Sequence, residues 1–346
     1  RDRKLAKWLE LSAGDKNAGI EVSNIVSATG GEKTKSKNDN DELIAKTLIA
    51  LDNDAPIRYR DISMHIDGMG AVLANACAHQ NQLELQNIVE IIRMNLPDFK
   101  AQRETEPDKG DRWIIQRQQA YIKFKSLGFG VERVLYDLNP SLPCQSPMLT
   151  GQFVLDCNQL LLFLNDNAAR LSTNEPVDRH IAAFIASKME LSSEVKLKVM
   201  SRLNKNESAL TQVTKLALLA FAQKKTKVQK LSGLANWIVE KLKPITNSIH
   251  SKTLRKEFND ELKNVANQGN LEVLLSVITG ADYFSRDDDG FAEARANYAA
   301  LDAEMKIIRA REKMLSGQDS FFIYGLQVAK IIAAVAFILM LGVMVS

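Results

Sequence analysis

The chain has 346 residues, enough for two ordinary domains or for one elongated helical array. Charged residues are 25% and hydrophobic residues 45% of the sequence, values close to those of soluble globular proteins, which excludes a largely disordered chain and a multi-span membrane protein. The formal net charge of +3 is too small to indicate a nucleic-acid-binding protein by itself. Any contact with a membrane must therefore be local.

The N-terminal segment, residues 1–14, predicts a short amphipathic helix, because Leu5, Trp8 and Leu9 recur at helical spacing before a glycine. Residues 15–41 are polar and rich in Gly, Ser, Lys and Asn, and they offer too little apolar area to offset the entropy of ordering. We expect a flexible linker there, and we expect the helix before it to act as a tether or as a partner-docking segment.

Residues 42–138 predict the first folded part, an N-terminal helical subdomain. Apolar residues recur at spacings of three and four in the stretch 62–77, and a second run, 83–92, follows the polar sequence "AHQNQ". This pattern indicates a helical hairpin that Pro97 ends. A helix, or a pair of helices broken around the sequence "GFG", is expected to follow it.

Residues 139–151 contain three prolines, and we interpret them as a connection between two helical layers. Residues 152–284 predict successive helices with Ser, Asn or Gly at most junctions, which together form a C-terminal helical subdomain. No segment shows the alternating apolar pattern of a strand together with hairpin signals. The sequence therefore predicts an all-α protein, an irregular helical bundle or a short α-solenoid, followed by a single C-terminal transmembrane helix.

Residues 285–320 predict a charged loop and then a juxtamembrane helix. The loop sequence "SRDDDGFAEARA" has the spacing of a calcium-binding loop but lacks its first ligand and its bidentate glutamate. In the helical part, large apolar residues recur at three and four over about two and a half heptads. This pattern indicates a stalk or a self-association seam, or alternatively a helix packed on the body. The seam residues are Tyr298, Leu301, Met305, Ile308 and Leu315.

Residues 321–346 predict a transmembrane helix. Fifteen uncharged residues run from Ile331 to Val345, and the aromatic stretch before them extends the helix to the roughly 20 residues that a bilayer core of about 30 Å requires. Lys330 precedes the run, where its stem can lie along hydrocarbon while its ammonium reaches the headgroups. A buried core helix is the alternative, but this run has no polar face. The residues assigned to the membrane anchor are Phe321, Phe322, Tyr324, Lys330, Ile331, Phe337 and Leu341.

The basic residues before the predicted span set its expected orientation. Four of them lie close to the span and no charge follows it, so the positive-inside rule places the N-terminal body in the cytoplasm. The four residues are Lys306, Arg309, Arg311 and Lys313. We therefore expect an integral, single-pass membrane protein with a cytoplasmic body.

The sequence contains no set of catalytic, cofactor-binding or metal-binding residues that we can assign. The three cysteines form no CxxC pair, the four histidines form no HxxxH or HExxH pair, and the glycine pairs lack the spacing of a phosphate-binding loop. One hydrolytic hypothesis is left open, in which His65, Asp67 and His79 converge in a single pocket.

These patterns predict a membrane-anchored cytoplasmic helical interaction module or scaffold that is not catalytic within this chain. The alternative is the regulatory and juxtamembrane region of a larger single-pass signalling enzyme whose catalytic domain precedes residue 1. The expected partners are the lipid bilayer and a protein, either a different one or a second copy of this chain. Neither nucleic acid nor a cofactor is expected, and the sequence does not specify a small-molecule substrate.

Overall fold

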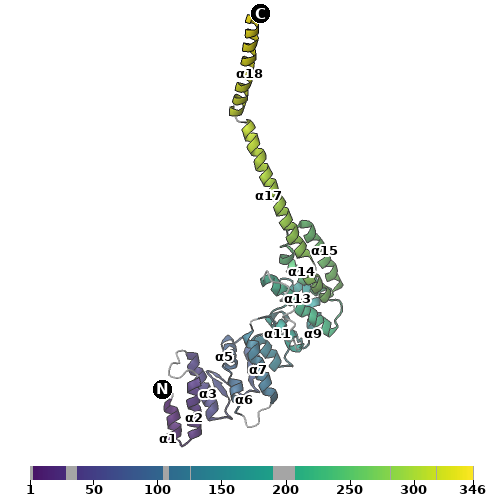
Figure 1. Cartoon of the computed structure of the whole chain (residues 1–346). Coiled ribbons are helices and arrows are strands. Elements are labelled where there is room, and N and C mark those ends of the chain that lie inside the picture. The colour runs from purple at the N-terminus through teal and green to yellow at the C-terminus, as the bar shows by residue number, and fades with distance from the viewer. Residues whose placement is uncertain are drawn as a thin grey trace. The chain divides into compact units, whose positions relative to one another are not determined.

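The computed structural model describes residues 3–28, 37–103, 109–124, 126–189, 207–280, 282–316 and 318–345. Within these ranges the protein is all-α, because its regular structure is helical apart from one short β-hairpin (Figure 1). The predicted fold class is therefore confirmed.

The chain forms two compact units, which are described separately below. The first unit comprises residues 1–246 and 259–281, and the second comprises residues 247–258 and 282–346. The helix α15, Lys252–Gln268, contributes to both units. The other elements of the first unit are α1 (Arg3–Leu11), α2 (Lys16–Ala28), α3 (Lys37–Leu51), β1 (Ile57–Tyr59), β2 (Ile62–Met64), α4 (Met69–Ala78), α5 (Gln82–Arg93), α6 (Leu96–Ala101), α7 (Lys109–Lys123), α8 (Val131–Leu138), a 3₁₀ turn (Pro147–Leu149), α9 (Cys157–Asp166), α10 (Ala168–Leu171), α11 (Arg179–Lys188), α13 (Glu207–Thr226), α14 (Ser232–Thr246) and α16 (Leu271–Gly280).

The three N-terminal helices pack together where a flexible linker was expected. Val22, Ile25 and Val26 of α2 are buried in one cluster with apolar residues of α1 and α3. The polar composition of residues 15–41 concealed these three apolar positions, whose helical spacing gives α2 a face that its neighbours cover. Residues 29–36 of the predicted linker lie outside the described residues.

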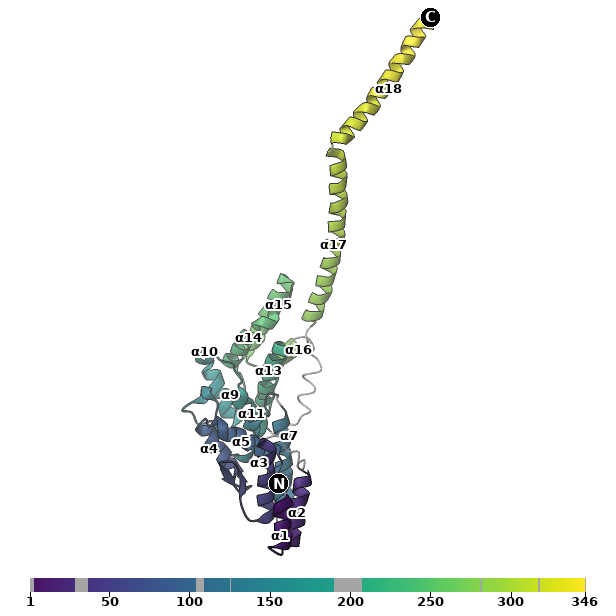
Figure 2. The same cartoon turned by 90° about the vertical axis from the view of Figure 1, so that its left-hand side faces the viewer.

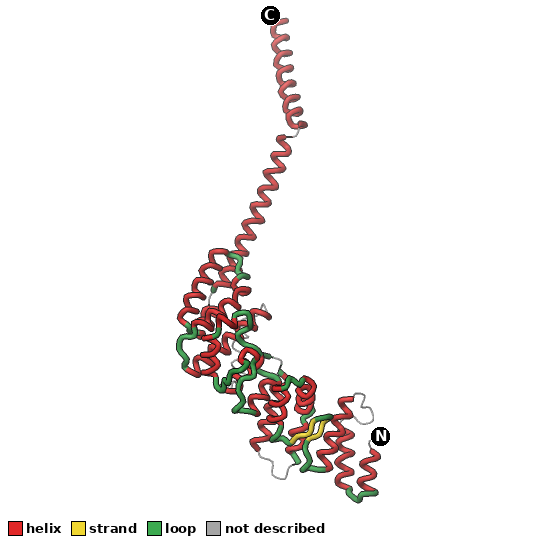
Figure 3. Tube along the Cα trace, turned by 180° about the vertical axis from the view of Figure 1, so that it is seen from behind, coloured by secondary structure: helices red, strands yellow, loops and turns green. Residues whose placement is uncertain are grey.

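A two-stranded β-hairpin occupies the start of the predicted helical hairpin (Figure 3). β1 and β2 are antiparallel, with Ile57 opposite Met64 and Tyr59 opposite Ile62, and these four side chains are buried. Their period of two places them on one face of the sheet. The sequence prediction counted Ile62 as helical, but α4 begins only at Met69.

The predicted helical break at "AHQNQ" is confirmed, whereas the predicted role of Pro97 is not. α4 ends at Ala78 and α5 begins at Gln82, with the Asn81 side chain accepting a hydrogen bond from the Glu84 amide at 3.2 Å. Pro97 lies in the first turn of α6, where its missing N–H removes no helical hydrogen bond. α5 has already ended at Arg93.

The helix pair α7 and α8 is broken at the two glycines that the sequence singled out. Gly128 and Gly130 have φ values of +83° and +95°, which side chains with a Cβ rarely adopt. The buried Arg133 of α8 forms an ion pair with Asp137 at 3.1 Å, and Asp137 also accepts a hydrogen bond from Ser187 of α11 at 2.6 Å. α8 and α11 thus pack within one compact unit, so the connection 139–151 between them does not separate two units.

Close helix packing continues through α9, α13, α14 and α16. The buried Gln223 side chain of α13 donates to the Gly269 carbonyl and accepts from the Leu271 amide, both at 2.8 Å, which joins α13 to the start of α16. At the start of α14, the Gly233 amide donates to the Asn165 side chain at 2.9 Å. One predicted helical stretch in this half, residues 192–205, lies outside the described residues.

The second unit contains the long helices α17, Tyr283–Ser316, and α18, Gln318–Val345, which Figure 2 shows as single helices. Residues 285–290, expected to form a charged loop, instead belong to the first turns of α17. These acidic residues match a calcium-binding loop in their spacing alone. The alanine-rich sequence that follows them favours a continuous helix, because alanine has the highest helix propensity.

We predict that replacing Gly269 with Ala destabilises the first unit. Gly269 has φ +72°, and a Cβ there would lie 2.5 Å from the Leu231 backbone nitrogen. The free energy of unfolding should fall by about 2 kcal/mol or more, because the positive φ disfavours a residue with a Cβ and the neighbouring backbone leaves no room for one. Urea denaturation followed by tryptophan fluorescence measures the change.

The matched control is Gly280→Ala, since no atom lies within 4 Å of a Cβ at Gly280. Its free energy of unfolding should stay within about 0.5 kcal/mol of that of the unmodified chain. Equal effects of the two substitutions would contradict the close packing at Gly269.

Candidate functional site

The helix α18 is the candidate membrane-spanning element. Its 20-residue stretch Phe321–Met340 is long and apolar enough to cross a bilayer, and 0% of it is buried. This is the single stretch of the described residues that meets both criteria. A buried core helix passes the same test of length and composition, but such a helix is covered by other side chains and this one is not.

The predicted anchor residues lie exposed along α18. Phe321 and Phe322 are 74% and 71% exposed, and Tyr324, Ile331 and Phe337 are similarly exposed. Lys330 is also exposed. Leu341 is within α18, but its side chain is outside the part of the chain whose side chains the structure describes. From residue 331 to residue 340 every residue is apolar and exposed, so this stretch of α18 has no polar face.

The preceding helix, α17, is exposed over most of its length. Every residue from 288 to 313 is exposed, and among them the seam residues Tyr298 and Leu301 are 75% and 60% exposed. Met305 and Ile308 share this exposure, whereas the side chain of Leu315 is outside the described part. Within the second unit, no described side chain covers these residues.

The basic residues that set the expected orientation lie on the last turns of α17. Lys306, Arg309, Arg311 and Lys313 are all exposed. Lys306 pairs with Asp302 one turn earlier at 2.9 Å, an exposed i,i+4 pair that contributes little stability. All four basic side chains are therefore accessible to solvent.

The start of α17 is fixed by Asp287, a residue whose role the sequence did not reveal. Its buried carboxylate accepts hydrogen bonds from the amides of His250 and Ser251, each at 2.8 Å, just before α15 begins. The His250 ring lies 2.9 Å from the same carboxylate and stacks on Phe291. Desolvation acts to raise the pKa of Asp287, but these hydrogen bonds outweigh it and lower the pKa. Asp287 thus joins α17 to the N-terminus of α15, where a negative charge is favourable.

The hydrolytic hypothesis for His65, Asp67 and His79 is wrong. His65 and Asp67 precede α4 and His79 follows it, so the ten residues of α4 separate them by about 15 Å. All three side chains are exposed, and the His79 ring bonds to the Asn75 carbonyl at 2.9 Å. Among the described residues, no group of three His, Cys, Asp or Glu side chains is placed to hold a metal ion.

A polar network around Tyr136 contains several chemically capable side chains, but their hydrogen bonds are structural. The Tyr136 hydroxyl accepts from the Gln145 amide at 2.8 Å and lies 3.2 Å from the His180 ring. The Ser146 hydroxyl donates to Asp178 at 2.5 Å, and Asp178 caps α11 by accepting from the Ile181 amide. The network ties the proline-rich connection to α8 and α11, and the histidine bonds the tyrosine, not the serine.

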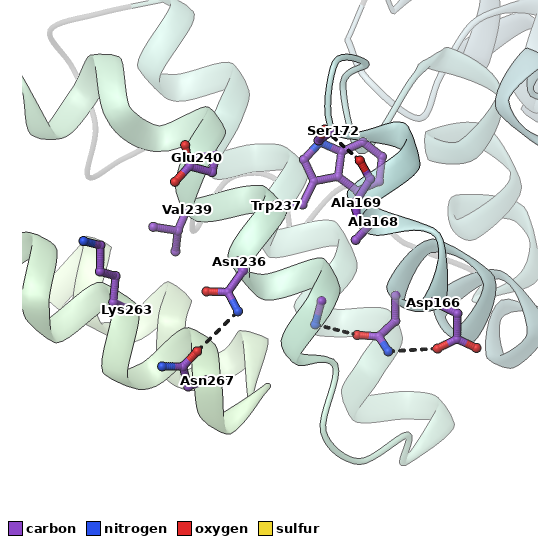
Figure 4. Close-up of a pocket in the computed structure, with 12 residues that line it drawn as sticks. Asp166, Ala168, Ala169, Ser172, Asn236, Trp237, Val239, Glu240, Lys263 and Asn267 are labelled. Carbon is purple, nitrogen blue, oxygen red and sulfur yellow. Dashed lines mark hydrogen bonds between the residues drawn. The ribbon is translucent and has the colours of Figure 1, made fainter.

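An open cleft of about 520 Å³ lies between α9, α10, α14 and α15 (Figure 4). Asn236 and Asn267 face each other across it at 3.3 Å, and Trp237 lies at one side with its indole N–H donating to the Asn174 carbonyl. The lining residues include Asp166, Glu240 and Lys263 but no histidine or cysteine. No nucleophile with an adjacent base is present among them, so the cleft has no catalytic arrangement.

A second hollow, of about 300 Å³, is apolar and lies between α1, α2 and α3. Its walls include Leu5 of α1 and three residues on one face of α3, Ile44, Leu48 and Leu51. These four side chains are partly exposed, with Ile44 57% exposed. The sequence could not reveal this groove, because it exists only where α2 packs against both neighbours. The predicted docking segment, residues 1–14, contributes one wall.

No family model, curated protein or solved structure matches this chain.

We predict that the native thiols react slowly. Burial raises the pKa of Cys77 to about 11 and those of Cys144 and Cys157 to about 12, so almost none of each thiol is ionised at pH 8. Reaction with a chromogenic disulfide reagent at pH 8 should be about 100-fold slower than in urea-denatured protein, with the half-buried Cys77 reacting first. A rapidly reacting thiol in the folded chain would contradict the burial of these side chains.

Proposed function

We propose that this chain is a single-pass membrane protein whose helical body lies in the cytoplasm and acts by binding protein partners. The observation that carries the proposal is α18, which has no polar residue from Ile331 to Val345 and is unburied from Phe321 to Met340. In water this surface would be strongly unfavourable, at about 25 cal/mol for each Å² of apolar area, and a bilayer removes it from water without a protein partner.

Lys330 indicates which part of α18 lies in the lipid. A span from Gly325 to Val345 is about 31 Å long, close to the thickness of the hydrocarbon core. Lys330 then lies only about 8 Å inside the N-terminal boundary, where its flexible stem can carry the ammonium back to the headgroups. Phe321, Phe322 and Tyr324 precede the span at the interface, the depth that aromatic side chains favour.

Orientation follows from the charges at the two ends of α18. The exposed basic residues at the end of α17 precede the span, and Lys330 is near the same boundary. No charged residue follows Lys330. The positive-inside rule therefore supports a cytoplasmic location for α17 and the body.

We predict that Val335→Asp prevents stable membrane integration. Val335 is at the centre of the proposed span, where an aspartate costs about 2.5–3.5 kcal/mol on the insertion scale. The unmodified chain should remain in the pellet after carbonate extraction, and the variant should appear in the supernatant. Val335→Leu is the matched control and should stay in the pellet. Release of the unmodified chain by carbonate would contradict the membrane assignment.

The apolar groove between α1 and α3 supports the second part of the proposal, the binding of a partner protein. Ile44, Leu48 and Leu51 recur at i, i+4 and i+7, so they form one stripe along α3, and Leu5 faces them across the groove. A partner helix with an apolar face is the occupant that suits this shape, because it would cover these side chains from end to end.

We predict that Ile44→Asp combined with Leu48→Asp abolishes capture of a stoichiometric partner from detergent-solubilised membranes. The carboxylates would have to be buried unpaired in the interface, so binding should weaken at least about 100-fold. Leu83→Asp is the control, because Leu83 is 60% exposed on α5 and does not line the groove. Recovery of no partner by the unmodified chain, or equal recovery by both variants, would argue against a binding function for this groove.

A further inference from the structure

The helix α17 carries an apolar stripe, and among the side chains that the structure describes in the second unit none covers it. In heptad notation, the a positions are Tyr298, Met305 and Glu312, and the d positions are Ala294, Leu301, Ile308 and Leu315. The large apolar residues at the a and d positions from Tyr298 to Ile308 are between 47% and 75% exposed, and Ile307, at a c position, is 56% exposed. Apart from Ile307, these residues follow the a and d positions, which form the narrow seam of a two-stranded coiled coil and not the wider face of a helix that packs on a globular body.

The charges beside this stripe identify the helix that fits it. In a parallel, in-register pair, a g residue of one helix faces the e residue five positions later on the other. Glu304 is at g and Arg309 is at e, so each helix would present opposite charges to the other, twice per pair because of the two-fold symmetry. The side chains of Glu304 and Arg309 are exposed. Arg311, at a g position, precedes the acidic residue Glu312 at an a position. The complementary partner of this helix is thus the helix itself.

The membrane sets the parallel orientation of two α17 helices and contributes part of their affinity for each other. Two copies anchored through α18 with their bodies on the same side have parallel α17 helices that begin at the same distance from the lipid. This step rests on the proposed membrane function. Three heptads make a weak coiled coil in solution, but confinement to one membrane raises the effective concentration of the second copy.

We propose that α17 forms a parallel, in-register two-stranded coiled coil with α17 of a second copy of this chain. Leu301 and Ile308 form its central d layers, and Glu304 of each copy pairs with Arg309 of the other. The fixed start of α17, where Asp287 binds the N-terminus of α15, leaves the stripe from Ala294 onward free to form the pair.

Cysteine cross-linking of the full chain in phosphatidylcholine vesicles tests the seam. Leu301→Cys and Ile308→Cys place thiols at d positions, where the two copies approach closely enough for a disulfide. Ala303→Cys and Ala310→Cys are the matched controls at f positions, on the opposite side of the helix. With a mild oxidant, disulfide-linked dimers should form about tenfold or more faster at the d positions than at the f positions. The native cysteines give little background because their raised pKa values keep them protonated.

Charge exchange tests the register. In the Leu301→Cys chain, Glu304→Arg places a like charge against Arg309 of the other copy, and cross-linking should slow several-fold. Arg309→Glu should slow it similarly, and the double exchange should restore the original rate, because opposite charges then face each other again. A double variant that cross-links no faster than the single variants would overturn the in-register arrangement.

Flotation of the same vesicles separates failure of the seam from failure of the membrane proposal. If the chain floats with the vesicles but cross-links equally at d and f positions, or at none, the coiled coil is overturned and the anchor stands. If the chain does not float, the proposed function is overturned, and with it the membrane-aligned dimer. Flotation together with preferential cross-linking at Leu301→Cys and Ile308→Cys supports both.

Discussion

A helix that is apolar on all sides constrains the rest of this molecule, because its surface must be kept from water. For α18, a protein core or a lipid bilayer can do so, and the described residues provide no covering core. We propose a bilayer as the environment in which the exposed anchor residues are favourable. Once α18 is placed there, the basic residues of α17 lie next to headgroups, Lys330 lies at the entry of the span, and two copies of α17 become parallel. In this proposal, one hydrophobic requirement accounts for the location, the orientation and the geometry of self-association.

The body differs from α17 and α18 in how its stability arises. Its helices are short, and several depend on hydrogen bonds from distant segments, such as Asn165 at the start of α14 and Gln223 between α13 and α16. Helices of this length are marginal in isolation, so tertiary packing stabilises them. α17 instead relies on a local property, its alanine-rich sequence, and on one fixed end at Asp287. This contrast explains how a 34-residue helix can remain exposed while the body buries its apolar residues.

The chemically capable polar groups described in the body form structural hydrogen bonds. Tyr136, His180, Ser146 and Asp178 have their hydrogen bonds committed to positioning the proline-rich connection. Burial keeps the three thiols protonated. What the described surface offers to other molecules is apolar area, in the groove between α1 and α3 and along the seam of α17. Such surfaces bind by removing apolar side chains from water, and they need no activated group.

The sequence by itself determined the features that depend on local pattern. The apolar run of α18, the heptads of α17, the break at the glycines between α7 and α8 and the all-α class follow from spacing and propensity, which neighbouring residues impose through the geometry of the helix. Only the tertiary structure decided the features that depend on distant partners. α2 is a helix because α1 and α3 cover Val22, Ile25 and Val26, and the segment 57–64 is a hairpin because its alternating residues are buried. The helix α4 keeps His65 and His79 apart. Asp287 binds the backbone at the N-terminus of α15, more than thirty residues away in sequence. Spacing along the chain contains no information about such contacts, because long-range packing brings these residues together or keeps them apart.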